Sequence, residues 1–147
     1  MIASRWCPEF RRLYGDVWPE TYAAIDIETT GFSREKDLVL EFGHCLVRGR
    51  EPADRGSLVL DWSDHPVVPD WWVRERLDKL ARRMQQDGRP WRLTYDYMRA
   101  EGVRADRALP YVLEFLEALR GSGTLLVGHN AYSFDEEMLA ANFEGFL

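Results

Sequence analysis

The sequence predicts one α/β domain built on a mixed β-sheet. Two observations lead to this prediction. Three apolar segments separated by short polar stretches come first, and they are typical of an antiparallel meander. A fourth short apolar segment follows much later, between two segments with helical periodicity. With 147 residues, the chain is long enough to bury one hydrophobic core.

The four strands are expected at residues 22–28, 37–47, 57–62 and 124–130. Residues 48–56 contain glycine and proline and are expected to form the turn between the second and third strands. Because a helix precedes the fourth strand, we expect it to lie parallel beside the first. The carboxyl ends of two such strands lie at the same sheet edge, where α/β proteins usually bind their ligands.

The first two helices are expected after the meander. Asp70 is a good N-cap for a helix that carries regularly spaced apolar residues and ends near Gly88. Thr94 is expected to cap a second, short helix that stops at Gly102.

The last two helices flank the fourth strand. Regularly spaced apolar residues over 109–119 predict an amphipathic helix, in which Pro110 is tolerated only in the first turn. The sequence Ser-Phe-Asp-Glu then forms a capping box, Ser133 with Glu136, which predicts a helix through about Asn142.

The composition excludes several classes of protein. The net charge of −6 argues against a protein that coats duplex nucleic acid regardless of sequence. No apolar run approaches the roughly 20 residues of a membrane span, and the N-terminal stretch lacks the apolar core of a signal peptide. Cys7 and Cys45 have no metal-binding spacing and are expected to be reduced thiols. A cytoplasmic protein without membrane contact is therefore expected.

The first strand carries two carboxylates in an otherwise apolar segment. Asp26 and Glu28 are two residues apart and therefore share one face of the strand, whereas Ile25 and Ile27 share the other. At about 6–7 Å and an effective dielectric constant near 20, two such charges repel by about 2–3 kcal/mol. An arginine, a bound proton or a cation would relieve that repulsion, as would exposure of the strand to water. If strand pairing brings Asp135 nearby, it would supply a third oxygen ligand for Mg²⁺ or Mn²⁺.

Two motifs resemble those of a known enzyme family. The sequence IDIETTGF at 25–32 resembles the first motif of the DEDD superfamily of 3′–5′ exonucleases, Asp-x-Glu-Thr-x-Gly. The sequence LVGHNAYSFDEEML at 126–139 resembles its second motif. The superfamily includes a proofreading subunit of the bacterial replicative polymerase, RNase T and oligoribonuclease. The resemblance implies an RNase H-like exonuclease domain at 21–147, incomplete at its C-terminal end, and an N-terminal extension at 1–20.

The resemblance also implies a reaction, the hydrolysis of phosphodiester bonds by two divalent ions, Mg²⁺ or Mn²⁺. Asp26 matches the carboxylate that bridges both ions, and Glu28 matches a ligand of the ion that carries the attacking water. Asp135 matches the carboxylate that holds the second ion.

The implied substrate is the 3′ end of single-stranded DNA or RNA. The backbone at Thr29 and Gly31 would approach the terminal nucleotide, and Phe32 would pack on its base or sugar. Asn130 would bond the substrate or brace the loop of the first motif. Many relatives dimerise, so the resemblance leaves a homodimer open as the oligomeric state.

The chain departs from the family at the third motif, a His or Tyr followed after four residues by Asp. Only 12 residues follow Asp135, and they contain no such pattern. One explanation is an incomplete copy of an exonuclease, which as given would have at most weak activity. Another is a noncatalytic nucleic-acid-binding or scaffold module that retains the fold. A third is an α/β domain whose acids bind a structural cation or face water.

Basic residues gather after the meander. The predicted helix over 71–86 carries five of them, and Arg89 and Arg92 follow directly. Such a run forms either a phosphate-contacting face or an ordinary solvated helix surface. Trp71 and Trp72 are expected to pack against the helix or core rather than to stack on bases.

Overall fold

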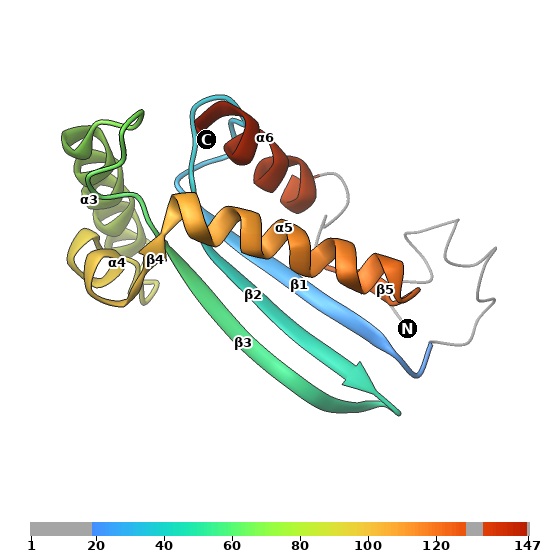
Figure 1. Cartoon of the computed structure of the whole chain (residues 1–147). Coiled ribbons are helices and arrows are strands. Elements are labelled where there is room, and N and C mark those ends of the chain that lie inside the picture. The colour runs from blue at the N-terminus through green and yellow to red at the C-terminus, as the bar shows by residue number, and fades with distance from the viewer. Residues whose placement is uncertain (1–18, 129–133, 147) are drawn as a thin grey trace.

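The computed structural model describes residues 19–128 and 134–146, and it contains a five-stranded mixed sheet (Figure 1). The strand order is β4-β3-β2-β1-β5. The meander is antiparallel and β5 lies parallel to β1, as predicted. The strands are β1 Tyr22–Thr29, β2 Val39–Arg48, β3 Glu51–Asp61, β4 Val103–Arg104 and β5 Leu125–Val127.

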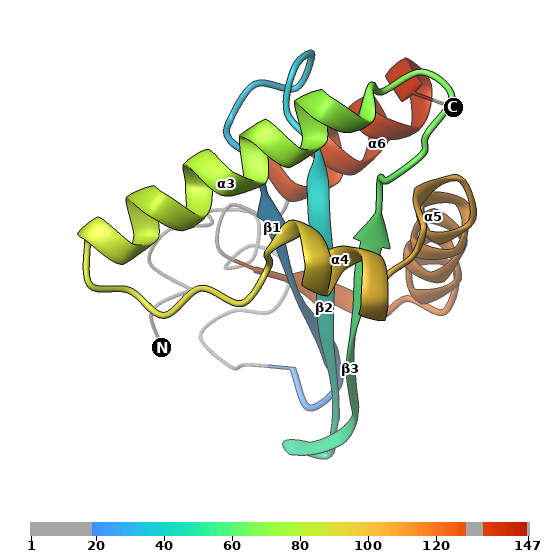
Figure 2. The same cartoon turned by 90° about the vertical axis from the view of Figure 1, so that its left-hand side faces the viewer.

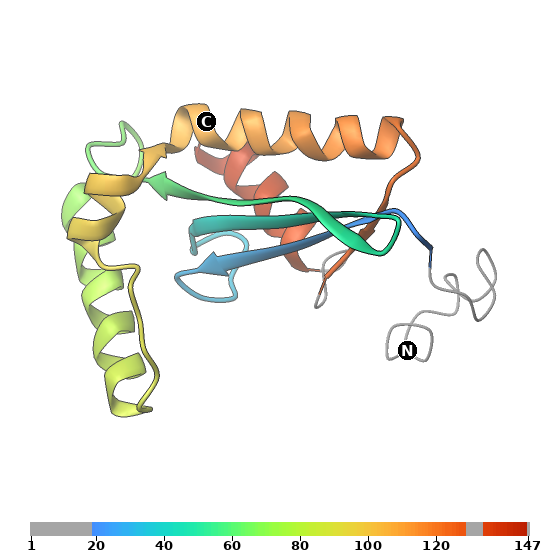
Figure 3. The ribbon, with the colours of Figure 1, turned by 90° about the horizontal axis from the view of Figure 1, so that it is seen from below.

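Four helices are described, and the sequence predicted all of them. They are α3 Asp70–Gln86, α4 Tyr95–Glu101, α5 Ala105–Gly121 and α6 Glu136–Phe146. Helices α5 and α6 cover the same face of the sheet (Figures 1 and 3). Helices α3 and α4 lie at the end of the sheet toward which β1 runs (Figure 2), and α3 projects past the sheet on the side away from α5 (Figure 3).

The hydrophobic core lies between the sheet and the helices. Ile25 and Ile27 of β1 are buried in one cluster with Val112 of α5 and Met138 and Leu139 of α6. Because alternate residues of a strand face opposite sides, this packing directs the side chains of the intervening acids to the face away from α5 and α6.

The turn predicted over 48–56 was too long. The hairpin turns on Gly49 and Arg50 alone, with φ values of 58° and 69°, and β3 begins at Glu51. A two-residue turn with positive φ at both positions matches the twist of the flanking strands. Pro52 is tolerated in β3 because β4 pairs only with the other end of the strand, and because Pro52 lies beside a β-bulge in which Ala53 of β3 is the extra residue.

Two helix predictions were wrong in detail. Asp70 is the first residue of α3 rather than its cap, which is Pro69. The Asp70 carboxylate instead accepts a hydrogen bond from the Tyr95 hydroxyl at 2.5 Å, so a tertiary contact replaces the local cap. Helix α5 begins at Ala105, ahead of its regular apolar spacing, and this places Pro110 in the second turn rather than the first.

Other helix ends follow the prediction. The Thr94 side chain accepts a hydrogen bond from the backbone N–H of Tyr97, and Gly88 follows the cap of α3 with a φ of 66°. The capping box at Ser133 lies outside the described residues, as do residues 129 and 130 of the predicted fourth strand. Among the described residues, no helix is both long enough and apolar enough to cross a lipid bilayer.

Candidate active site

The two acids of β1 lie on one exposed face of the strand, as predicted. Asp26 and Glu28 are exposed, whereas Ile25 and Ile27 are buried on the other face. The register of β1 and β2 places Gly43 opposite Asp26 and Glu41 opposite Glu28. Because directly paired residues share a face, Glu41 is a third carboxylate beside the pair, at a typical Cβ separation of about 5 Å from Glu28.

An arginine holds this third carboxylate. Glu41 is only 7% exposed, and Arg92 donates from Nη2 to its Oε1 at 2.5 Å. Arg92 also donates from Nη1 to the Tyr97 hydroxyl at 3.3 Å. The hydrogen bond to Glu41 raises the pKa of Arg92, so this guanidinium is a permanent positive charge beside the acids.

The neighbouring acids disfavour ionisation of Glu28. The side chain of Glu28 is exposed, but the surrounding groups partly desolvate its carboxylate, and this desolvation raises its pKa. The charges of Asp26 and Glu41 raise the pKa further, whereas Arg92 opposes the shift. In the described part of the chain, no hydrogen bond or ion pair neutralises Asp26 or Glu28; the guanidinium pairs with Glu41 instead. A cation at this face would therefore relieve repulsion that the described residues leave in place.

The loop after β1 is built around the buried carboxylate of Asp37, which is 5% exposed. Its Oδ1 accepts hydrogen bonds from the Thr30 hydroxyl at 2.9 Å and from Arg76 Nη1 at 3.0 Å. Its Oδ2 accepts the backbone N–H of Ser33 at 2.9 Å. Three donors from the loop and α3 thus fix the loop, which we call the Asp37 loop (residues 30–37).

The structure gives Gly31 a packing role. A Cβ at this position would lie 2.5 Å from Asp37 Oδ2, well inside contact distance, so only glycine fits beside the carboxylate. The neighbouring Thr29 follows an irregularity in the β1–β2 register, and its hydroxyl donates to the Gly31 carbonyl at 2.6 Å. The approach of Thr29 and Gly31 to a nucleotide stays a prediction.

The Asp37 loop contacts the start of α6. The ring of Phe32 is 82% exposed and lies 5.9 Å, centroid to centroid, from the ring of Phe134. Arg34 forms an ion pair with Glu137. These contacts place the segment that contains Asp135, whose side chain is 2% exposed, beside the loop that follows β1. The described contact of the Phe32 ring is with Phe134, and its contact with a nucleotide stays a prediction.

Asn142 joins α6 to the start of β2, and the sequence analysis did not single it out. Its side chain is fully buried, accepts the backbone N–H of Val39 at 2.8 Å and donates to the Asp37 carbonyl at 3.0 Å. The available signal was an amide on the same helix face as Met138 and Leu139. A polar residue on an apolar helix face needs buried partners.

The two described histidines are engaged in other contacts. His44 is on the helix-covered face, where its ring packs 4.9 Å from that of Phe115. His65 is buried and its Nδ1 accepts the backbone N–H groups of Val67 and Val68, both at 3.3 Å. Burial lowers the pKa of His65. Neither residue is therefore a candidate for a general base at the acid pair.

The described residues do not complete a metal site. In residues 19–128 and 134–146, no group of three or more His, Cys, Asp or Glu side chains is arranged to hold a metal ion. His129 and Asn130 lie outside these ranges. The assignment of Asp26, Glu28 and Asp135 as metal ligands therefore stays a prediction.

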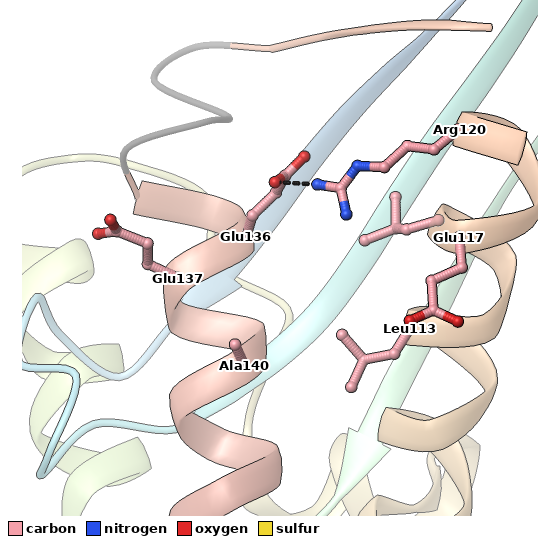
Figure 4. A pocket seen from close by; sticks show the side chains of 7 residues that line it. Leu113, Glu117, Arg120, Glu136, Glu137 and Ala140 are labelled. Atoms are coloured by element: carbon pink, nitrogen blue, oxygen red, sulfur yellow. Dashed lines mark hydrogen bonds and ion pairs between the residues drawn. The ribbon is translucent and has the colours of Figure 1, made fainter. Parts of the chain in front are cut away.

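A separate groove of about 340 Å³ lies between α5 and α6 (Figure 4). An ion pair between Arg120 and Glu136 crosses it, while Leu113 and Ala140 form part of its wall. Because α5 and α6 cover the face of the sheet opposite to Asp26, this groove is not part of the candidate site.

Comparison with known proteins gives a result at the level of structure only. No protein-family model matches the sequence, and no curated protein matches it. A solved complex of E. coli exonuclease I with single-stranded DNA and zinc matches 87% of this chain with a TM-score of 0.57 at 14% identity. The metal-free form of that complex matches 87% of the chain with a TM-score of 0.59 at 15% identity. The chain has the fold of the part of exonuclease I that it matches.

A moderately thermophilic exonuclease I from Methylocaldum szegediense has the same fold, with a TM-score of 0.58 over 85% of this chain at 18% identity. In each of these three structures the match covers 24% of the exonuclease I chain. The present chain thus spans about a quarter of the length of those proteins. The exonuclease I fold confirms the predicted α/β, RNase H-like class and the resemblance to the DEDD exonucleases at the level of the fold.

Proposed function

We propose that residues 21–147, preceded by an extension at 1–20, form a metal-dependent exonuclease domain that acts on the 3′ ends of single-stranded DNA or RNA. The observation that carries the proposal is the exposed pair Asp26 and Glu28 on β1, within the exonuclease I fold. Two acids on a solvated surface strand can also be without a function. A pair with a third carboxylate opposite it, and with the pKa of one member raised, is typical of a functional site.

The residues fit part of a divalent-metal site. Carboxylate oxygens are the ligands that Mg²⁺ and Mn²⁺ prefer, and Asp26 and Glu28 present two of them on one face. Asp135 would supply the third, as the second motif implies. When bound, such ions activate water and stabilise the charge that develops on the scissile phosphate.

The residues of this chain would bind and orient the substrate around those ions. Asp26 and Glu28 would fix the position of the cations, and the Asp37 loop would hold the β1 terminus in place. Phe32, exposed at the surface of that loop, would stack on the terminal base or sugar.

The test is digestion of 5′-labelled single strands of DNA and RNA with Mn²⁺ or Mg²⁺. We expect a ladder of products shortened from the 3′ end, and a loss of rate of at least about 100-fold in Asp26→Ala and in Asp135→Ala. Glu114→Ala, an exposed acid on α5, is the matched control and should digest normally. Digestion by Asp26→Ala at the wild-type rate would refute the assignment.

A second candidate function is a noncatalytic module that binds single strands. It is favoured by the absence of a three-ligand group among the described side chains. The discriminating measurement is the thermal unfolding midpoint as Mn²⁺ is added. A midpoint that rises in the wild type but not in Asp26→Ala supports the enzyme, because ligand that binds only the folded state stabilises it. Strand binding without any response to Mn²⁺ supports the module.

A further inference from the structure

Arg92 is a cation that lies beside the acid pair. Its partner Glu41 pairs directly with Glu28 across β1 and β2, so the guanidinium lies at the same face of the sheet as the proposed site. It is also the positive charge that opposes the raised pKa of Glu28. A polyanionic strand bound across Asp26 and Glu28 would therefore come within reach of Arg92.

The guanidinium is held firmly and remains accessible. Glu41, more than nine-tenths buried, accepts from Nη2, and the Tyr97 hydroxyl accepts from Nη1. The Arg92 carbon Cζ lies 5.4 Å from the centre of the Tyr97 ring. A guanidinium has five N–H donors, and among the described residues these two contacts use two of them. The Arg92 side chain remains 53% exposed.

Simple neutralisation of Glu41 is the plainer explanation of this pair. Neutralisation accounts for the hydrogen bond between Arg92 and Glu41. It does not explain why the Arg92 side chain stays about half exposed, with N–H donors that these two contacts do not use. Arginine suits the binding of a second anion because its planar guanidinium can bond a carboxylate and a phosphate at the same time.

We propose that Arg92 is a phosphate-binding residue that contacts the non-bridging oxygens of one phosphodiester of a bound single strand. Glu41 and Tyr97 position its guanidinium for this contact. The inference rests on the proposed function, since it places the strand across the face that carries Asp26 and Glu28. It assigns to Arg92 a role in holding the substrate, separate from any role in the chemistry.

The test measures binding of a labelled oligodeoxythymidine by fluorescence anisotropy, in EDTA, over about 50–200 mM salt. It is made in a Glu41→Gln background, where Arg92 no longer has a carboxylate to neutralise. Arg92→Ala is compared with Arg89→Ala, which removes an equal charge from an exposed residue three positions earlier. Glutamine has the shape of glutamate, and its side-chain oxygen can still accept the hydrogen bond from Nη2 of Arg92, so this background removes the charge of Glu41 and keeps the position of the guanidinium.

We expect Arg92→Ala to weaken binding by about 5–10-fold and to lower the slope of log affinity against log salt by about 0.7, the value for one phosphate contact on a single strand. Arg89→Ala should change neither quantity appreciably. Equal effects of the two substitutions would overturn the assignment of Arg92 and leave the exonuclease proposal standing. A wild-type chain that neither binds nor digests single strands would overturn both.

Discussion

Gly31→Ala should destabilise the fold, and the reason lies in the Asp37 loop. The added Cβ would lie 2.5 Å from Oδ2, 2.7 Å from Cγ and 2.8 Å from Oδ1 of Asp37. The carboxylate cannot move aside freely, because Thr30, Ser33 and Arg76 all donate to it. Either the loop backbone shifts or the carboxylate gives up some of these hydrogen bonds.

The magnitude follows from what must be lost. Overpacking a filled site costs about 1–3 kcal/mol, and a hydrogen bond to a charged group contributes about 1.5–3 kcal/mol. Because relief of the clash and loss of a bond are alternatives rather than independent terms, we expect the free energy of unfolding to fall by about 2–3 kcal/mol. Equilibrium urea unfolding measures this as a lower midpoint at an unchanged slope.

A double-mutant cycle tests the cause. In an Asp37→Ala background the obstructing carboxylate is gone, so Gly31→Ala should cost less than about 0.5 kcal/mol. Gly121→Ala, at the end of α5 where a Cβ meets nothing within 4 Å, is the control and should be neutral or slightly stabilising. If Gly31→Ala costs as much without Asp37 as with it, the steric reasoning is refuted.

Three further predictions concern other buried or crowded polar groups. Asn142→Ala leaves two backbone groups of the β2 start unpaired in the core and should lower the free energy of unfolding by about 2–4 kcal/mol, whereas the exposed Gln85→Ala should not. His65 has a folded-state pKa below its unfolded value, so the unfolded chain binds more protons as pH falls below about 6.5 and stability should decline there; His65→Gln should reduce the decline in the urea midpoint. Glu28→Gln should raise the thermal midpoint at neutral pH, because the folded state disfavours ionised Glu28, and the exposed Glu114→Gln should leave it unchanged. A midpoint lowered by Glu28→Gln would contradict the crowding of charge at this face.

The sequence was informative where local patterns decide the structure. Alternation along 22–28 predicted both the strand and the shared face of Asp26 and Glu28, because strand periodicity is local. The parallel pairing of β5 with β1 followed from the helix between them.

The rest of the site depends on contacts that sequence spacing does not reveal. Glu41 joins the acids only through the β1–β2 register, and that register contains an irregularity next to Glu28. Arg92 reaches Glu41 from a segment about 50 residues away, and Asn142 reaches β2 from about 100 residues away. At Asp70 the local pattern was misleading. The residue type predicted a helix cap, but the Asp70 carboxylate instead accepts a hydrogen bond from Tyr95.

The outer edge of the first half of β3, which pairs with no strand among the described residues, has a consequence for how the molecule behaves in solution. An exposed strand edge is a template on which a second chain can add a strand and begin aggregation. Here the edge carries Pro52, which offers no N–H, and the exposed charges of Asp54 and Arg55. We infer that these three residues make this edge of the hairpin a poor template for the addition of a strand from a second chain.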